Sequence, residues 1–142
     1  YEESFRTPFL LLGRPELRGK RIAAPAFSQL DIAPTVLDLL DLEVQNHFLG
    51  RSLLDPRNTQ EVAQILVQPF DGTYLCVVKY PYKYVQHRRG GEQLLFDLVQ
   101  DPFEKSNLIH EPGKSAALHE FRDEVNQFRL YERVVEENRI WP

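Results

Sequence analysis

The sequence predicts an α+β fold: a short α/β segment, then an antiparallel sheet of about four strands and a long C-terminal helix. Three observations support it. Residues 30–42 carry apolar side chains at helical spacing, 62–98 are rich in β-branched and aromatic residues between turn signals, and 115–138 carry one apolar stripe. A chain of 142 residues, 42% hydrophobic and 27% charged, is long enough to bury such a core.

The first part is expected to cover residues 1–55 and to begin with a strand. Four consecutive apolar residues, 9–12, lie between Pro8 and Gly13. A short apolar run bounded by Pro and Gly is typical of a strand buried on both faces. A polar loop follows, with Pro and Gly at several positions.

A helix is predicted from Asp31 to about Leu42. The Asp31 carboxylate can cap its N-terminus, and Pro34 falls in the first turn, where a missing N–H costs no hydrogen bond. The apolar side chains that repeat at helical spacing are Ile32, Val36, Leu39 and Leu40.

The second part is expected to cover residues 56–142, after an irregular boundary at 55–60. Its strands are predicted at 62–68, 73–80, 82–87 and 93–98. Asp71-Gly72 and Gly90-Gly91 are turn signals, which predict an antiparallel meander. The terminal helix is expected over 115–138, with a stripe formed by Leu118, Phe121, Val125 and Phe128.

Composition excludes several classes of function. The formal net charge of −4 and the pI near 5.6 argue against a nucleic-acid partner, which needs a concentrated positive field. The single cysteine, Cys76, excludes an internal disulfide or a Cys-rich zinc site, and mid-strand it is expected to be a small buried hydrophobe. The chain has no Met and starts at Tyr1, so we expect it to be processed or cut from a longer protein.

The densest basic group is Lys79, Lys83, His87, Arg88 and Arg89. Period-two alternation predicts that Lys79, Lys83 and His87 share one face. Interleaved tyrosines make a polyanion surface conceivable. The favoured interpretation is a solvated strand face, because the whole chain is acidic.

Five segments, at 1–11, 28–40, 50–54, 79–85 and 95–108, resemble in order and spacing the C-terminal third of the sulfatase family. That family lies within the alkaline phosphatase superfamily, together with phosphoglycerol and phosphoethanolamine transferases. The resemblance implies the C-terminal part of an alkaline-phosphatase-like α/β fold. Taken alone, capping and turn chemistry also explain the individual motif residues.

The resemblance implies a parent enzyme that hydrolyses sulfuric or phosphoric esters with a divalent metal, Ca, Mg, Mn or Zn. The nucleophile and the Asp-His metal ligands of that family have no counterpart here, since no Pro-Ser-Arg follows Cys76 and no Asp-His-Gly is present. We therefore expect no catalytic residue and no metal or cofactor in these residues, and no activity of the chain alone. The implied partners are an N-terminal catalytic half of the same parent and an anionic ester substrate, and the implied location is extracytoplasmic.

Two residues are expected near substrate, from the resemblance: Arg6, in the first motif, and His47, whose loop can approach the substrate side in the family. His87, His110 and His119 have no partner at a metal-binding spacing. Three alternatives stay open at this point: a membrane-anchored phosphoglycerol or phosphoethanolamine transferase, with its anchor outside these residues, a non-catalytic α+β interaction module, and a nucleic-acid binder.

Overall fold

The computed structural model describes residues 8–11, 27–55, 63–68, 73–89 and 91–138. The chain divides into two compact units, Tyr1–Val62 and Ala63–Pro142. Arg6, the Asp71-Gly72 turn and most of the expected boundary at 55–60 lie outside the described residues. The division at residue 55 therefore stays a prediction.

The helix of the first unit begins with a 3-10 turn, Gln29–Asp31, that continues into α1, Ile32–Leu39. Its N-terminal cap is Ser28, whose hydroxyl accepts the Leu30 N–H while Asp31 Oδ2 accepts the Ser28 N–H at 2.9 Å. Asp31 stands at the N-cap position of α1, but the expected cap by its carboxylate is wrong, because that carboxylate accepts the N–H groups of Ser28 and Arg51 instead. Ser28 has the extended backbone of a cap, whereas Asp31 is already helical at φ −79° and ψ −12°.

Helix α1 ends at Leu39, three residues before the expected end. Asp41 takes the left-handed conformation, at φ 52°, and its N–H donates to the Asp38 carbonyl. The Leu42 N–H donates back to the Leu37 carbonyl at 3.0 Å. This is a Schellman motif, so the backbone reverses although the apolar spacing continues.

Residues 8–11 are not in a strand, and the side chains of Phe9 and Leu10 are 46% and 76% exposed. The expected buried strand is therefore wrong for this part of 9–12. An apolar run becomes a strand where a neighbour completes its hydrogen bonds, and none of the described strands pairs with it.

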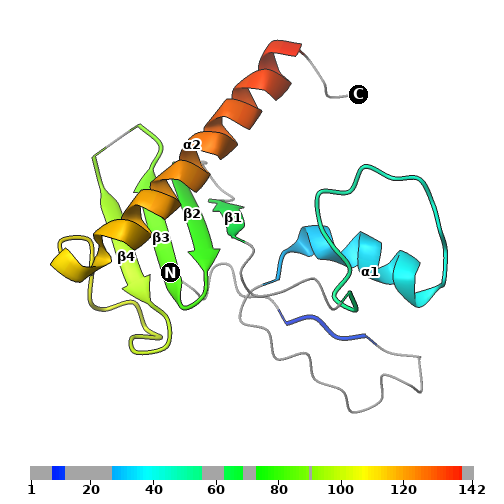
Figure 1. Ribbon diagram of the computed structural model, residues 1–142, viewed down its shortest axis with the longest axis horizontal. Coiled ribbons are helices and arrows are strands. Elements are labelled where there is room, and N and C mark those ends of the chain that lie inside the picture. The colour runs from blue at the N-terminus through cyan, green and yellow to red at the C-terminus, as the bar shows by residue number, and fades with distance from the viewer. Residues whose placement is uncertain (1–7, 12–26, 56–62, 69–72, 90, 139–142) are drawn as a thin grey trace. The chain divides into compact units, whose positions relative to one another are not determined.

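The second unit contains a four-stranded antiparallel sheet in the order β1-β2-β3-β4 (Figure 1). Its strands are β1 Gln64–Val67, β2 Tyr74–Lys79, β3 Tyr82–His87 and β4 Gln93–Asp97. The predicted meander is confirmed, and β3 has the predicted bounds. Val77 pairs with Tyr84, and Tyr84 with Leu95, which places these three side chains on the same face.

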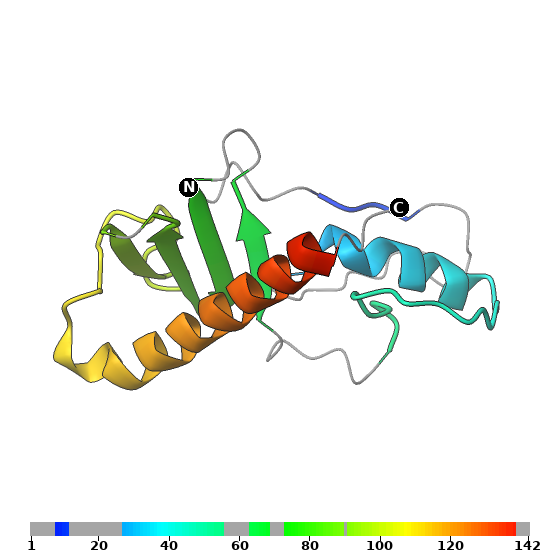
Figure 2. The ribbon, with the colours of Figure 1, turned by 90° about the horizontal axis from the view of Figure 1, so that it is seen from above.

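The long helix α2, Ser115–Asn138, runs across one face of the sheet and extends beyond it (Figures 1 and 2). The predicted stripe packs on that face. Tyr84 stacks on Phe121 with ring centroids 6.0 Å apart. The buried core consists of Leu75, Val77, Tyr84, Leu95, Leu118, Phe121 and Val125. Cys76, 3% exposed, is a small buried hydrophobe as expected.

Candidate functional site

Polar side chains on one side of α1 form hydrogen bonds with residues 51–53, which follow the loop after the helix. Thr35 and Asp31 are 0% and 4% exposed, so their polar atoms need partners within the protein. We call these contacts the α1 clip. Its hydrogen bonds are Arg51 N–H to Asp31 Oδ1 (2.8 Å), Leu53 N–H to Thr35 Oγ1 (2.9 Å) and Ser52 hydroxyl to Asp38 Oδ2 (2.6 Å).

Gly50 lets the backbone approach close enough for the α1 clip to form. A Cβ at this position would lie 2.1 Å from the Leu30 carbonyl oxygen. No side chain other than hydrogen fits there without a backbone shift. Two of the motif segments, 28–40 and 50–54, are therefore bound to each other, and the intervening loop is fixed at both ends.

That loop carries His47, the predicted substrate-proximal residue. The Asn46 side chain donates to the Val44 carbonyl at 2.9 Å and accepts the Phe48 N–H at 3.2 Å. This Asx turn shapes the backbone around His47, whose side chain is exposed. Exposure leaves the imidazole able to meet a ligand, while its proximity to a substrate stays a prediction.

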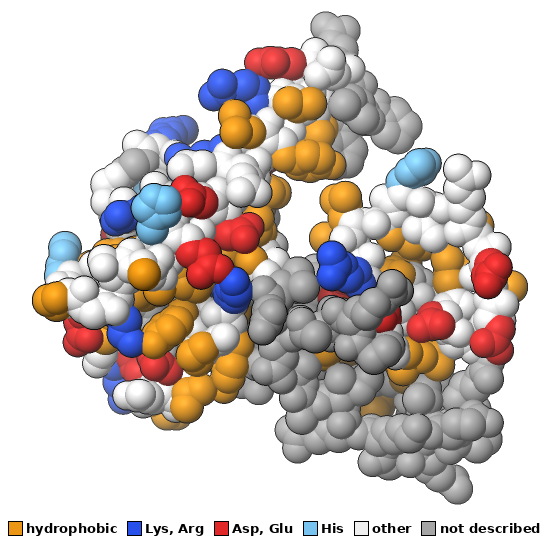
Figure 3. Space-filling view, in the orientation of Figure 1, with side chains coloured by type: hydrophobic (Ala, Val, Ile, Leu, Met, Phe, Trp, Pro, Cys, Tyr) orange, Lys and Arg blue, Asp and Glu red, His pale blue; other side chains and the backbone are white. Residues whose placement is uncertain are grey.

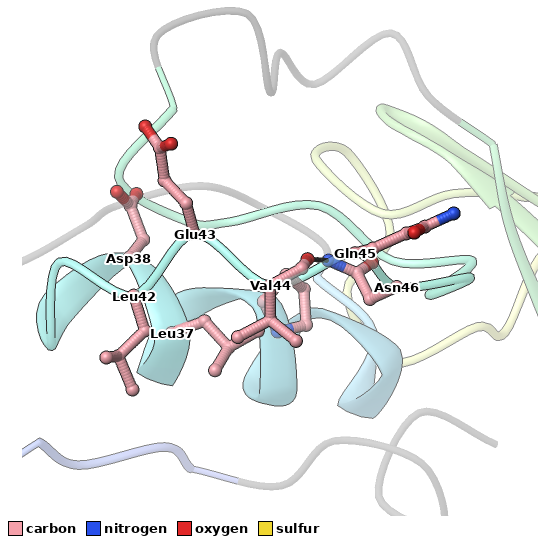
Figure 4. Close-up of a pocket in the computed structure, with 8 residues that line it drawn as sticks. Leu37, Asp38, Leu42, Glu43, Val44, Gln45 and Asn46 are labelled. Carbon is pink, nitrogen blue, oxygen red and sulfur yellow. Dashed lines mark hydrogen bonds between the residues drawn. The ribbon is translucent and has the colours of Figure 1, made fainter.

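A shallow cavity of about 490 Å³ lies between α1 and the same loop (Figure 4). The apolar side chains of Leu37, Leu42 and Val44 lie together, and the carboxylates of Asp38 and Glu43 point away from them. His47 is not among the residues that line it. The lining contains no pairing of a nucleophile with a base.

In the second unit, a buried ion pair joins two other motif segments. Lys83 Nζ lies 2.6 Å from Glu104 Oε1, and the two side chains are 1% and 2% exposed. Lys83 belongs to segment 79–85 and Glu104 to segment 95–108. Two fully desolvated charges are tolerated because each neutralises the other.

The expectation that Lys79 and Lys83 share a solvated face is wrong. Lys79 pairs across the sheet with Tyr82, and Lys83 with Val78, so they lie on opposite faces. The reason is the turn at Tyr80-Pro81, which places Lys79 in β2 and Lys83 in β3. The alternation of side chains along a single strand therefore does not continue from one lysine to the other. Lys79 instead reaches Glu120 of α2.

Segment 95–108 contains the end of β4 and a loop that returns along the outer edge of that strand. Asp97 Oδ1 accepts the Val99 and Gln100 N–H groups, at 3.0 and 3.1 Å. Asn107 Oδ1 accepts the N–H groups of Leu95 and Ile109, at 2.9 and 3.1 Å. The turn chemistry expected for these polar residues is therefore what the structure shows.

Arg88, another cation of the basic group, also meets an acidic side chain. Both terminal nitrogens of Arg88 donate to Glu132, at 3.1 and 2.7 Å. Figure 3 shows acidic side chains interspersed with basic ones on the visible face of the four-stranded unit. Such pairing weakens the positive field that a polyanion would need.

Within the described residues, no group of three or more His, Cys, Asp and Glu side chains could hold a metal ion. His119 is exposed, and its Nδ1 lies 3.0 Å from Asp123 Oδ2, one turn along α2. A catalytic metal does not fit the donor sets present here. The helices in this part of the chain include none long and apolar enough to cross a membrane.

Comparison with known proteins decides the family. The family model described as N-sulphoglucosamine sulphohydrolase, C-terminal, matches residues 1–131. The chain belongs to the sulfatase family. In this sulfatase C-terminal domain, four of the five motif segments therefore form two structural contacts, the α1 clip and the Lys83–Glu104 pair, and one ordered loop.

Two curated relatives match most of the domain. The Ulvan-active sulfatase of Formosa agariphila is 27% identical, over 89% of this chain and 27% of its own length. The multifunctional alkaline phosphatase superfamily protein PehA of Trinickia caryophylli is 29% identical, over 90% of this chain and 29% of its own length. The domain thus spans less than a third of the length of either protein.

The fold agrees with a solved structure. A putative sulfatase from Bacteroides thetaiotaomicron superposes with a TM-score of 0.59 at 23% identity, covering 76% of this chain and 25% of that one. The sheet and helix of the domain are thus an alkaline-phosphatase-like C-terminal architecture.

Sequence reasoning missed the Lys83–Glu104 pair and the Ser28 cap. For the cap, a signal was present: Ser28 stands three residues before an acidic side chain, at the spacing of a capping box. For the ion pair, no local signal exists, because its partners are 21 residues apart and meet through the fold.

Proposed function

We propose that this chain is the C-terminal part of a sulfatase-like enzyme that hydrolyses sulfuric esters, and that it is inactive alone. The observation that carries the proposal is the family match over residues 1–131. It is supported by the way the motif residues are used, because they hold the domain's own backbone and leave no reactive pair among the described residues.

In this proposal the nucleophile and the divalent metal belong to the N-terminal catalytic half of the parent protein. The donor sets of the described residues support this placement, since none of them suits a metal. Cys76 supports it too, because a thiol buried in β2 cannot reach a substrate. The domain's role is to close one side of the active-site cleft and to shape substrate choice.

We propose His47 and Arg6 as the residues of this chain nearest to the anionic ester. The exposed position of His47, on a loop fixed at both ends by the α1 clip, suits a contact with substrate. Arg6 would supply a permanent positive charge. We further propose that residues 1–55 complete the α/β core, that 56–142 form the subdomain, and that the parent works on the extracytoplasmic side.

The test begins with sequencing of the coding DNA upstream of the Tyr1 codon. A Cys or Ser followed by x-Pro-Ser-Arg, with an Asp-His pair before Tyr1, is expected. The 142-residue chain and the longer chain are then assayed for release of 4-nitrocatechol from its sulfate ester, with Ca²⁺, Mg²⁺ or Mn²⁺. The proposal is supported if the longer chain hydrolyses the ester and the 142-residue chain does not, and it is contradicted if the 142-residue chain is active. An immediate start codon would leave an interaction module as the function.

A phosphoric ester is the second candidate substrate, and the similarity to PehA favours keeping it. A Thr nucleophile encoded upstream, after several apolar spans, would identify a membrane-anchored phosphotransferase instead. The same assay with 4-nitrophenyl phosphate separates the two classes. For the sulfatase, we expect hydrolysis of the sulfate ester to exceed that of the phosphate ester.

A further inference from the structure

Helix α1 has the opposite of the usual polarity for a surface helix. Two polar side chains on one side of it, Asp31 and Thr35, are buried in the α1 clip, while Asp38 joins the clip but stays exposed. The apolar side chains of Ile32, Val36 and Leu40 are exposed, although a surface helix normally turns its apolar stripe toward a core. The polar side is therefore hydrogen-bonded to residues 51–53 of the first unit, whereas the described residues show no comparable hydrogen-bonded contact on the apolar side.

The exposed apolar side is continuous along the helix. Ile32, Val36 and Leu40 follow at intervals of four, so their side chains lie in a row. They are 37%, 40% and 56% exposed. More apolar side chains are exposed before and after the helix: Leu30 (56%), Leu42 (51%), Val44 (54%), Phe48 (46%) and Leu49 (70%). We call Ile32, Val36 and Leu40 the α1 stripe.

We infer that the α1 stripe is the docking surface for the N-terminal catalytic portion of the same polypeptide, and this rests on the proposed function. The matched relatives are each more than three times as long as the region that this chain covers. A large part of such a protein would therefore lie outside these residues and be available to cover the stripe.

The chemistry of the α1 stripe favours an intramolecular partner over the other occupants. The helix carries one charged side chain, Asp38, and the α1 clip turns it to the other side. Permanent interfaces resemble a domain core cut in half, apolar and depleted of charge. A membrane-surface helix would carry Lys or Arg on its polar side, and α1 has neither.

The first experiment uses the 142-residue chain as it is. An apolar dye, 8-anilinonaphthalene-1-sulfonate, is expected to bind it, and Val36→Asp is expected to reduce the binding. Val99→Asp is the matched control, because Val99 is also apolar and exposed, at 57%, but lies outside the α1 stripe. Circular dichroism checks that each variant folds, and Leu40→Asp serves as a second variant. Absence of dye binding would overturn the inference.

The second experiment titrates the chain with the separately expressed portion encoded upstream of Tyr1. We expect a one-to-one complex that Val36→Asp weakens about 100-fold or more, because a carboxylate would be buried without a partner. Val99→Asp should leave the dissociation constant unchanged. Equal affinities of the two variants would overturn the inference, and so would Val36-dependent dimerisation of the chain or Val36-dependent binding to phosphatidylcholine vesicles.

Sulfate ester hydrolysis by the reconstituted complex distinguishes the two proposals. If formation of the complex depends on Val36 but the complex hydrolyses no ester, the docking surface is supported and the proposed function is refuted. An active complex that tolerates Val36→Asp refutes the docking surface and leaves the function standing.

Discussion

The buried Lys83–Glu104 pair makes the sharpest prediction about stability. Glu104→Gln keeps the shape of the side chain but leaves the Lys83 ammonium, 1% exposed, without its counter-charge at 2.6 Å. Removal of one member of a buried pair costs about 3–5 kcal/mol. Each 1.4 kcal/mol is a factor of ten, so the unfolding equilibrium should shift by roughly two to three and a half powers of ten.

The assay is urea denaturation followed by circular dichroism, with amide exchange of β3 to assign the loss to the second unit. Because small domains have only about 5–15 kcal/mol of stability, the midpoint should fall visibly. Lys79→Met is the matched control, because Lys79 is 31% exposed in its pair with Glu120, and exposed pairs contribute only about 0–1 kcal/mol.

A double variant separates the pair from its surroundings. Lys83→Met with Glu104→Gln removes both charges together, and such replacements are often neutral or even stabilising. The double variant should therefore be more stable than Glu104→Gln alone by at least about 2 kcal/mol. A loss below about 1 kcal/mol for Glu104→Gln, or strictly additive losses, would refute this account of the pair.

Three further predictions concern single side chains. Gly50→Ala should destabilise the first unit by about 1–3 kcal/mol or more, because its Cβ would lie 2.1 Å from the Leu30 carbonyl oxygen; thermal melts of Gly113→Ala, where a Cβ meets nothing within 4 Å, give the control. Asn107→Ala should cost about 1–3 kcal/mol, because two backbone N–H groups lose their acceptor, and equal β4 amide exchange in both proteins would contradict this. Burial raises the pKa of Tyr84 above 10.0, against smaller opposing effects of Arg122 and Arg129. The folded state therefore holds this proton more tightly, and the resulting stability is complete below pH 10 and falls as the pH rises further. Tyr84→Phe, which also removes a buried hydroxyl without a hydrogen-bond partner among the described residues, should flatten that alkaline loss without lowering stability at pH 7.

The helix and strands of the second unit could be predicted almost completely from the sequence, because their signals are local, whereas the Lys83–Glu104 pair could not. The apolar stripe of α2 and the alternating strands each fit one period, and the Gly and Pro residues separate them. The helix bounds 115–138 and the strand bounds 82–87 match the structure. Local signals suffice there because β-meander connections are short and each strand pairs with the next.

The first unit could be predicted less well, because its contacts are distant in sequence. Helix α1 ends at Leu39 because Asp41 takes the left-handed conformation. Aspartate tolerates that conformation but does not require it, so the sequence does not predict this end. The α1 clip joins residues 14 to 20 positions apart. The apolar run at 9–12 predicted a strand, but a strand also needs a neighbour, and periodicity carries no information about that neighbour.

The candidate site was reached by resemblance rather than by spacing. His47 lies in an exposed loop, and no motif of general chemistry marks it. Polar residues of the motif segments, such as Asp31, Thr35 and Asn107, bind the backbone instead. Side chains that satisfy buried backbone groups resemble site residues in sequence, and geometry alone tells the two apart.

The contact between Asn107–Leu108 and β4 also affects how the domain behaves among other copies of itself. The Leu108 N–H donates to the outward carbonyl of Leu95 at 2.8 Å, and the Asn107 side chain accepts the Leu95 N–H at 2.9 Å. An edge strand with vacant backbone groups is a template for aggregation. A strand from another molecule could add to β4 only after it displaced this loop, so the contact acts as a guard against polymerisation at that edge.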